Sequence, residues 1–389
     1  MTPVSAKVLE QFPVQWAREK NKNPDVSQFG GIKGSNTTFA LIKTLQPVFD
    51  GTDNNKYYAR ILLVDFSKAF DHIDHETVLK KLHNNGVDNI LIQWFRGFLT
   101  DRKQRVVVGE HSSEWKSVSG GVPQGTLSGP ELFVNMVSDM NPELPTIKYV
   151  DDTTIIEVLQ RDQPSQMQST IDWLVQWCDH NFMSINAAKT VEIRVDFGKE
   201  KVQVPQLHVG DNTIKVAPSA KLLGVIISHD LKWDKHADHI YMKASQRLQY
   251  LRILHRCGLT QDQLRQVYIT LIRPILEYAC QVWTTGLSSE SSKLLESIQK
   301  RACRIICPGK NYKDALEQTK LESLYDCRIH KCKDLFQQMQ NSHHKLHSML
   351  PKKKVCHYST RNPSQYPLPK CKTNRTKNSF VPWCLFHCQ

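Results

Sequence analysis

Two adjacent aspartates, Asp151 and Asp152, lie within the segment "IKYVDDTTIIEV", residues 147–158, which is otherwise suited to a buried β-hairpin. A buried pair of acids costs several kcal/mol unless a cation lies against it. Side chains alternate across a strand, so neighbouring acids diverge in regular β-structure and converge better at a tight turn. We therefore expect the pair at a turn, with one of the two as the main ligand of a cation.

A third acid, Asp65, ends another apolar β-type run, "KYYARILLVDF". Carboxylates that converge from neighbouring strands at one sheet edge form a hard oxygen site, which suits Mg²⁺. Two such ions ~4 Å apart can promote an in-line phosphoryl displacement. On the acids alone, the simpler interpretation as turn and cap residues is favoured.

The pattern of elements changes near residue 232. Before it, helical segments alternate with β-type runs, and the first helix is expected to end at Pro13. After it, only helices are predicted, at about 234–256, 260–282 and 288–306, with weaker ones to about 340, and Pro274 is expected to kink the second. The sequence thus predicts an α/β domain, then a helical domain, then a tail.

Charge is concentrated near the C-terminus. The chain of 389 residues carries 51 Lys and Arg against 38 Asp and Glu, a net charge of +13, and residues 335–389 contain no acid. The nine cations of that stretch, which include Lys345 and Arg361, suit a nucleic acid. The simpler interpretation, favoured on charge alone, is a solvated and poorly ordered tail.

Cysteines and apolar runs exclude several classes of protein. The eleven cysteines form no CxxC pair, so we expect neither a secreted disulfide framework nor a standard zinc finger. The cysteines at 303, 307, 327 and 332, with His330, are interpreted as helix-core residues rather than metal ligands. No apolar run reaches the length of a signal peptide or membrane helix, so we expect an intracellular protein of nucleus or cytoplasm without a membrane partner.

Three segments, taken in order, resemble motifs A, B and C of reverse transcriptases: "LLVDFSKAFDHIDHETVLKKL", "GGVPQGTLSGPELF" and "YVDDTTI". The nearest resemblance is to non-LTR, LINE-type retrotransposons of the jockey branch. "WLVQWCDHNFMSINAAKT" resembles motif D, "KLLGVIISHDLKWDKHADHI" resembles motif E with the start of the thumb, and "SFVPWCLFHCQ" resembles the C-terminal end of such elements. Group II intron and telomerase-type enzymes share the palm but match these segments less well.

The resemblance implies an α/β (α+β) right-hand polymerase palm with partial fingers, followed by an all-helical thumb. The expected divisions are 1–57 for partial fingers, 58–230 for the palm, 231–340 for the thumb and connection, and 341–389 for the basic C-terminal tail. The implied activity is RNA-directed DNA polymerisation from dNTPs onto a DNA primer along an RNA template. The implied cofactor is a pair of Mg²⁺ ions, which Mn²⁺ can replace.

The family's metal and sugar positions carry over onto five residues. Asp65 and Asp151 match the two main metal-binding aspartates, Asp152 matches their companion, and the backbone carbonyl of Phe66 matches a further ligand. Phe70 matches the aromatic ring beneath the sugar of the incoming nucleotide. A ring there would collide with a 2′-hydroxyl and so favour dNTP over rNTP.

Further positions match nucleotide contacts. Gly125 shapes the "GVPQG" loop, where Gln124 is expected to contact the nucleotide or the template backbone. Lys189 in "INAAKT" matches a motif D lysine suited to protonating the departing pyrophosphate. As an isolated lysine after a helix, it would otherwise be interpreted as solvated surface.

Contacts with the nucleic acid backbone are expected in two places. Arg102, Lys103 and Arg105 are candidate phosphate contacts, and a solvated start of a strand is an equally open interpretation. Lys221 of the "KLLGV" hairpin and Trp233 are expected to hold the primer terminus near the aspartates.

Two departures from the family pattern concern the fingers. Gly31 stands where an aromatic residue is common after "QFG", and the arginine-containing segment that usually precedes the "SAKVLE" helix is not present in the sequence. Nor is an upstream endonuclease domain, so we expect an N-terminally truncated copy, with a fragmentary gene model or one exon of a longer product as open alternatives. Loss of the triphosphate grip leaves open a catalytically inactive, nucleic-acid-binding remnant. The sequence does not indicate an oligomeric state.

Overall fold

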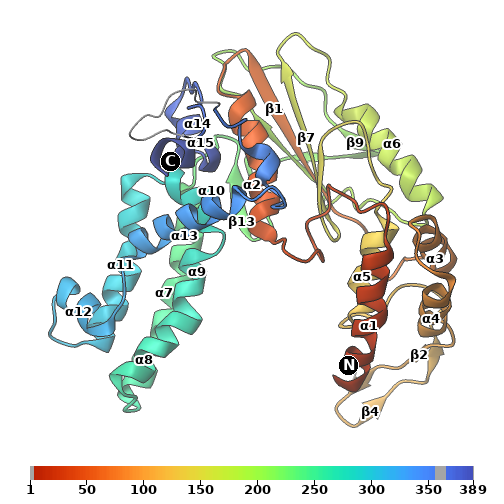
Figure 1. Ribbon diagram of the computed structural model, residues 1–389, viewed down its shortest axis with the longest axis horizontal. Coiled ribbons are helices and arrows are strands. Elements are labelled where there is room, and N and C mark those ends of the chain that lie inside the picture. Colours follow the sequence, from red (N-terminus) through yellow and green to blue (C-terminus); the bar gives the residue numbers. More distant parts are fainter. Residues whose placement is uncertain (1–3, 355–364, 389) are drawn as a thin grey trace.

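The computed structural model describes residues 4–354 and 365–388. A five-stranded sheet lies at its centre, in the order β11-β8-β1-β7-β6, and all neighbouring strands are antiparallel except β11 and β8 (Figure 1). Its strands are β1 (Tyr57–Val64), β6 (Thr146–Tyr149), β7 (Asp152–Gln160), β8 (Val191–Val195) and β11 (Lys215–Val216). The predicted strand at 57–64 and the hairpin around the acid pair are confirmed.

Both faces of this sheet are buried. On β1, Ala59 and Ile61 join the core that contains helix α2 (Thr37–Gly51), whereas Leu62 and Val64 join a second core on the opposite face. The second core is built with helices α3 (His75–Asn84), α4 (Asn89–Leu99), α5 (Ser128–Met136) and α6 (Met167–His180). Burial on two faces explains why the β1 run is continuously apolar rather than alternating.

Helix α1 (Val4–Lys20) continues through Pro13, so the expectation that it ends there is wrong. Val14 and Ala17, which follow the proline, are buried against the second core, and this packing outweighs the hydrogen bond that proline cannot donate. Buried Glu10 of α1 accepts hydrogen bonds from the backbone N–H groups of Leu127 and Ser128, at 2.7 and 2.9 Å. α1 therefore caps α5 and fixes the loop before it.

The two strands expected at 104–120 form a hairpin of short pieces. β2 (Lys103–Gln104) pairs with β5 (Lys116–Ser117), and β3 (Val107–Val108) pairs with β4 (His111–Ser112). Further short strands follow α6 and complete the β-structure: β9 (His208–Val209), β10 (Asn212–Thr213), β12 (Ser219–Leu222) and β13 (Val225–Ser228).

Residues 234–339 are helical, as predicted, and in Figure 1 these helices and the group α1, α3, α4 and α5 lie on opposite sides of the molecule. The helix expected at 260–282 is divided: Tyr268–Ile272 is a π-helix, Pro274 lies in the first turn of the next helix, and Ala279 has a φ of 48°. The helices are α7 (Asp234–Arg256), α8 (Gln261–Val267), α9 (Arg273–Glu277), α10 (Cys280–Trp283), α11 (Ser289–Ile306), α12 (Tyr312–Thr319) and α13 (Leu324–Met339).

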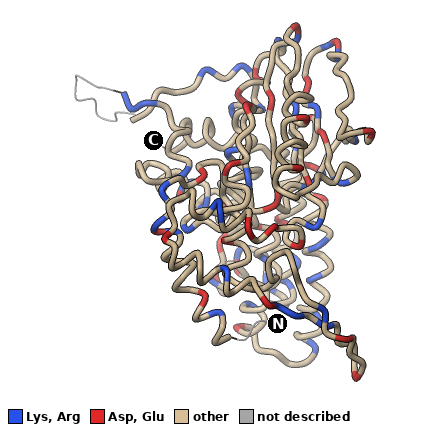
Figure 2. The backbone as a smooth tube through the Cα atoms, turned by 90° about the vertical axis from the view of Figure 1, so that its right-hand side faces the viewer, with Lys and Arg blue, Asp and Glu red and all other residues tan. Residues whose placement is uncertain are grey.

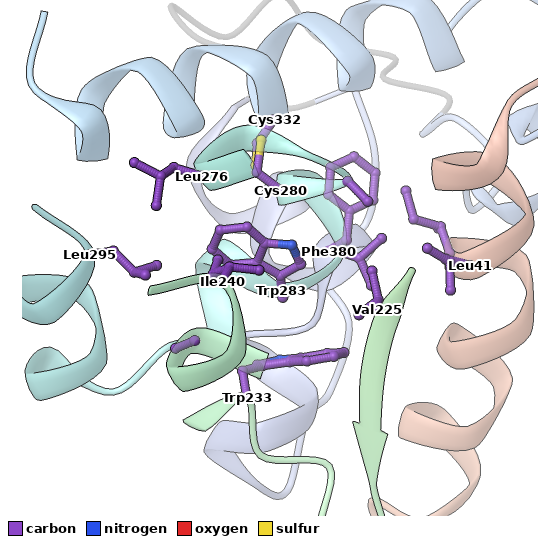
Figure 3. Close-up of a cluster of buried hydrophobic side chains, with 14 of the residues drawn as sticks. Leu41, Val225, Trp233, Ile240, Leu276, Cys280, Trp283, Leu295, Cys332 and Phe380 are labelled. Atoms are coloured by element: carbon purple, nitrogen blue, oxygen red, sulfur yellow. The ribbon is translucent and has the colours of Figure 1, made fainter. Parts of the chain in front are cut away.

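The C-terminal stretch is not a solvated tail where the structure describes it, which corrects that expectation. Helices α14 (Asn374–Lys377) and α15 (Phe380–His387) return to the core, and Phe380 lies near Trp283 in the same cluster as Leu41 of α2 (Figure 3). Helix α15 contains no Lys, Arg, Asp or Glu, so its apolar side chains are buried without desolvating such a charge. Arg361 lies outside the described residues, and Lys and Arg are also spread along the rest of the chain (Figure 2).

The interpretation of the helical cysteines as core residues is confirmed for three of the four, whereas Cys327 is half-buried and His330 is exposed. Cys303, Cys307 and Cys332 are buried, and Cys332 faces Cys280 inside the helical core (Figure 3). Burial raises the pKa of the Cys303 thiol to about 12, which keeps it protonated. Within residues 4–354 and 365–388, no helix has the length and apolar character needed to cross a membrane.

Candidate active site

The predicted aspartates lie together at one end of the central sheet. Val64 of β1 is opposite Thr153 of β7, so Asp65, the next residue, follows in register toward Asp152. Asp152 in turn pairs with Tyr149 of β6, which leaves Val150 and Asp151 as the two-residue turn. The turn expected from the sequence at this acid pair is therefore present.

The three carboxylates influence one another electrostatically. Partial burial of the Asp152 carboxyl, with the negative charges of Asp151 and Asp65, raises its pKa to about 6. Like charges held this close favour a bound cation, because a cation removes the repulsion that raises the pKa. The arrangement is a concentrated acidic site rather than a set of isolated turn caps.

The backbone around Asp65 is fixed by the loop before β8. The Asp65 N–H donates to the hydroxyl of Thr190 at 3.2 Å, and the Asp65 carbonyl accepts from the N–H of Asn186 at 2.8 Å. Phe66 forms an isolated bridge with Ile185, and the two hydrogen bonds of that bridge do not use the Phe66 carbonyl. The oxygen that the family resemblance assigns to Mg²⁺ is therefore not consumed by this bridge.

One carboxylate oxygen has no hydrogen bond. Asp65 Oδ2 is buried and finds no hydrogen-bond partner among the described residues, while Lys189 Nζ lies 3.8 Å from it. The Lys189 side chain is 70% exposed, so its ammonium group is held loosely and can move toward a substrate. The structure brings Lys189 to Asp65, and its role toward the departing pyrophosphate stays a prediction.

These oxygens fit Mg²⁺. No group of three or more Asp, Glu, His or Cys side chains is placed to hold one ion in the part of the chain that the structure describes. Mg²⁺ does not require such a cage, because in phosphoryl-transfer sites it takes one or two carboxylates and completes its shell with water and substrate phosphates. The Oδ2 of Asp65, which accepts no hydrogen bond in the described residues, and the raised pKa of Asp152 are the features that such an ion would relieve.

Phe70 lies between the end of β1, which leads to Asp65, and the "GVPQG" loop. Its half-buried ring stacks on Phe133, with centroids 4.9 Å apart and planes 21° apart. Its carbonyl accepts from the N–H of Val122 at 2.8 Å. Gly121 has a φ of 77°, and a Cβ there would lie 2.7 Å from the Asp71 carbonyl, so this close approach requires glycine. The ring is thus held rigidly beside the loop.

A cavity of about 630 Å³ opens beside that loop. Gln124 lines it together with Arg102 and Lys103, as does exposed Lys68, which the sequence analysis did not single out. Lys68 has a φ of 45° and follows Asp65 by three residues in an irregular turn, so neither strand nor helix periodicity revealed it. The cavity therefore brings cations from two separate segments to the loop that carries Gln124.

Other predicted contacts are placed differently. Gly125 is exposed with a φ of 79°, a conformation that suits glycine in this loop. Arg105 lies 4.8 Å from the ring of Trp115 on the hairpin and does not line the cavity. Lys221 is exposed on β12, and its contact with a primer stays a prediction.

The expectation that Trp233 touches the primer terminus is corrected. Its side chain is 4% exposed within the core, and a Cβ on Gly286 would lie 2.7 Å from its indole nitrogen. Figure 3 shows the indole among the buried side chains between β13 and the helices. A buried ring has no surface for a nucleic acid, so Trp233 acts through packing.

The model of the family described as "Reverse transcriptase (RNA-dependent DNA polymerase)" matches residues 2–227, which include all three aspartates. The chain belongs to this family. As the sequence indicated, it carries a reverse transcriptase domain, which has mixed α/β structure.

Relatives include several Drosophila mobile elements. The chain is 24% identical over 309 residues to a probable RNA-directed DNA polymerase from transposon BS of Drosophila melanogaster, covering 75% of this chain and 33% of the relative. It is 26% identical over 255 residues to the polymerase of the jockey element of the same species, covering 62% and 27%. The chain thus spans about a third or less of the length of these relatives.

Among solved structures, a Candida tropicalis telomerase has a TM-score of 0.45 at 13% identity, with 87% of this chain and 50% of that chain covered. The RNA-dependent RNA polymerase of a human picobirnavirus has a TM-score of 0.40 at 12% identity, with 76% and 53% covered.

Proposed function

We propose that this chain acts as an RNA-directed DNA polymerase, joining a primer 3′-hydroxyl to the α-phosphate of a dNTP along an RNA template. The observation that supports this best is the meeting of Asp65 with Asp151 and Asp152 at one sheet end, in a chain of the reverse transcriptase family. Such carboxylates on neighbouring strands are the means by which a polymerase holds its metal ions.

Asp65, Asp151 and the carbonyl of Phe66 would hold two Mg²⁺ ions, with Asp152 beside them, and Mn²⁺ fits the same oxygen ligands. When bound, these ions lower the pKa of the attacking hydroxyl and stabilise charge on the leaving oxygen. Lys189, whose ammonium group lies 3.8 Å from Asp65 Oδ2, is placed to neutralise the departing pyrophosphate or to give it a proton.

Nucleic acid contacts surround this centre. Gln124, Arg102 and Lys103 line the cavity beside the loop and suit phosphate groups of the nucleotide or the template. Arg105 and Lys221, both exposed, would add backbone contacts to template and primer. These partners are an RNA template, a DNA primer and dNTPs, so the site of action is the nucleus or the cytoplasm.

The sugar is selected by Phe70. Its ring stacks on Phe133, which favours one position of the ring for excluding a 2′-hydroxyl. We expect Phe70→Ala to raise rNTP incorporation relative to dNTP by roughly 10- to 200-fold, the range for one steric contact in a pocket. Ratios of kcat/KM for each nucleotide measure this, and an unchanged ratio would exclude Phe70 from sugar selection.

The test of the proposed function is primer extension on poly(rA)/oligo(dT) with Mg²⁺, run beside Asp151→Asn. We expect the wild-type chain to extend the primer and Asp151→Asn to fall by several orders of magnitude while binding the duplex equally well. The rival is an inactive remnant that binds nucleic acid. If the wild-type chain binds the duplex but extends it no better than the variant, the rival is correct.

A further inference from the structure

A segment outside the sheet, Asp25–Gly30, lies along the strand that leads to the acid pair; we call it the strap. Gln28 forms a parallel bridge with Lys148 of β6. The Phe29 N–H donates to the Lys148 carbonyl at 2.7 Å, and the Lys148 N–H donates to the Ser27 carbonyl at 2.9 Å. The strap therefore follows β6 up to the turn that carries Asp151.

The Gln28 side chain holds that turn directly. Gln28 is fully buried, and its Oε1 accepts from the N–H of Val150 at 2.9 Å and from the N–H of Gly30 at 2.9 Å. Nε2 of Gln28 has no hydrogen-bond partner in the described residues, so the side chain forms its hydrogen bonds through Oε1. One oxygen thus connects the strap to the residue before Asp151.

The turn needs such support because its backbone is strained. Val150 has a φ of 60°, a conformation that a β-branched residue avoids and that costs of order 1–3 kcal/mol. A strained conformation persists only where the surroundings fix it. Gly30 fits this contact, since a Cβ on it would lie 2.5 Å from the Val150 nitrogen.

Both ends of the strap are anchored to the rest of the protein. Lys148 Nζ lies 2.8 Å from Asp25 Oδ2, with side chains 0% and 3% exposed, and it also donates to the Val137 carbonyl at 2.8 Å. From the C-terminal region, Lys345 donates to the Gln28 carbonyl and lies 4.6 Å from the Phe29 ring. Lys345, expected to be a tail cation for nucleic acid, thus binds the strap.

We propose that Gln28 is a positioning residue for the reaction, holding the Val150–Asp151 turn in the geometry that presents the Asp151 carboxylate. This inference rests on the proposed polymerase function. Gln28 touches neither substrate nor metal; it acts through the N–H of Val150.

The first test is steady-state extension by Gln28→Met and Gln28→Glu in the full chain. Met fills a similar volume without the accepting oxygen, so we expect kcat to fall roughly 10- to 100-fold, as a displacement of about 1 Å can do. We expect the KM for dNTP and the Kd for primer-template to stay within about 3-fold. Glu keeps an accepting oxygen but also buries a carboxyl charge, near the Lys345 ammonium, so Gln28→Glu should retain more of the wild-type kcat than Gln28→Met.

A matched control is Gln46→Met on α2. Gln46 is 5% exposed, accepts from the Val381 N–H and donates to Asp50 and Ser379, so its loss also removes buried hydrogen bonds. We expect it to lose stability as Gln28→Met does while keeping the wild-type kcat. An equal fall of kcat in both variants, or in Gln28→Glu and Gln28→Met, would overturn the positioning role.

A second measurement separates this inference from the proposed function. Hydrogen exchange at the Val150 amide needs no activity, and we expect Gln28→Met to exchange there at least 10-fold faster, with β1 amides unchanged. Unchanged exchange at Val150 would overturn the inference even where the polymerase is active. If Gln28→Met does not fold, Lys345→Met serves instead, with faster exchange at Gly30 and Val150 expected and unchanged exchange contradicting the role of the strap.

Discussion

The sheet and the helical region each bury an arginine, but they surround it with different contacts. In the sheet, Arg60 of β1 meets Glu192 of β8 at 2.6 Å, with side chains 2% and 0% exposed. In the helical region, Arg328 is equally buried, yet its Nε, Nη1 and Nη2 find no hydrogen-bond partner in residues 4–354 and 365–388, and its guanidinium lies 5.4 Å from the Trp283 ring. In the sheet the buried arginine is held by a directional ion pair, whereas in the helical region it is held by packing.

This difference in contacts corresponds to the residues that each region has to position. Arg60 joins the strand that ends in Asp65 to its neighbour, and Lys148 joins the strand before Asp151 to the strap. Paired charges have narrow angular and distance preferences, so they fix strands precisely. None of the proposed metal ligands lies in the described helices of residues 234–339, where burial lowers the pKa of Arg328 without a compensating ion pair.

The largest expected effect comes from breaking the pair in the sheet. Arg60→Met leaves Glu192 buried beside only Arg194, so we expect the free energy of unfolding to fall by about 3–5 kcal/mol. Urea unfolding measures this. In the double variant, Arg60→Met with Glu192→Leu, no carboxylate is left buried without its partner, so the loss of stability should be smaller. A loss under about 1 kcal/mol in Arg60→Met alone would contradict the comparison.

A smaller effect on stability is expected when the pH is lowered, and it arises at the junction of β13 and α7. His236 is 1% exposed, its Nδ1 accepts from the Ile226 N–H at 3.3 Å, and burial, with the charges of His239 and Lys243, lowers its pKa to about 4. As the pH falls, His236 is therefore protonated in the unfolded chain before it is protonated in the folded one. The free energy of unfolding that this residue contributes above pH 6.5 is lost as the pH falls toward 4. At about 1.36 kcal/mol per unit, the loss is on the order of 3 kcal/mol.

Urea unfolding of the wild type and His236→Gln between pH 7.5 and 4.5 checks this. The variant should show the weaker dependence on pH, since its side chain does not titrate. Parallel pH profiles would mean that His236 does not link this junction to pH.

The smallest effect is expected at Arg328. Replacing an unpaired buried cation by an apolar side chain of similar length removes a desolvation cost, so Arg328→Met should change the free energy of unfolding by under about 1 kcal/mol, or raise it. The same urea measurement applies. A loss as large as that of Arg60→Met would show that the helical region also depends on a directional contact.

The parts of the fold that the sequence predicted are those with a local cause. The helix at 234–256 matches the prediction, and Asn36 and Asp74 cap α2 and α3 with side chains typical of that position. The acid pair stood out because carboxylates are costly in an apolar β run, and the motifs before and after it indicated its role. Local patterns determined these features.

What the sequence did not predict depends on distant contacts. Pro13 stays inside a helix because of tertiary burial, and the break at Ala279 and the return of α15 depend on packing across the chain. Gln28 escaped notice because its partner, Val150, lies 122 residues away and is a backbone N–H. Such a contact leaves no periodic pattern in the sequence.

The central claim is that the carboxylates at the end of β1 and in the β6–β7 turn hold the catalytic metal ions. Fe²⁺ substituted for Mg²⁺, with ascorbate and peroxide, cleaves the backbone near a bound ion and maps this directly. We predict cuts close to Asp65 and Asp151 that excess Mg²⁺ suppresses and that Asp65→Asn with Asp151→Asn abolishes. Cuts elsewhere, or cuts that persist in the double variant, would contradict the account.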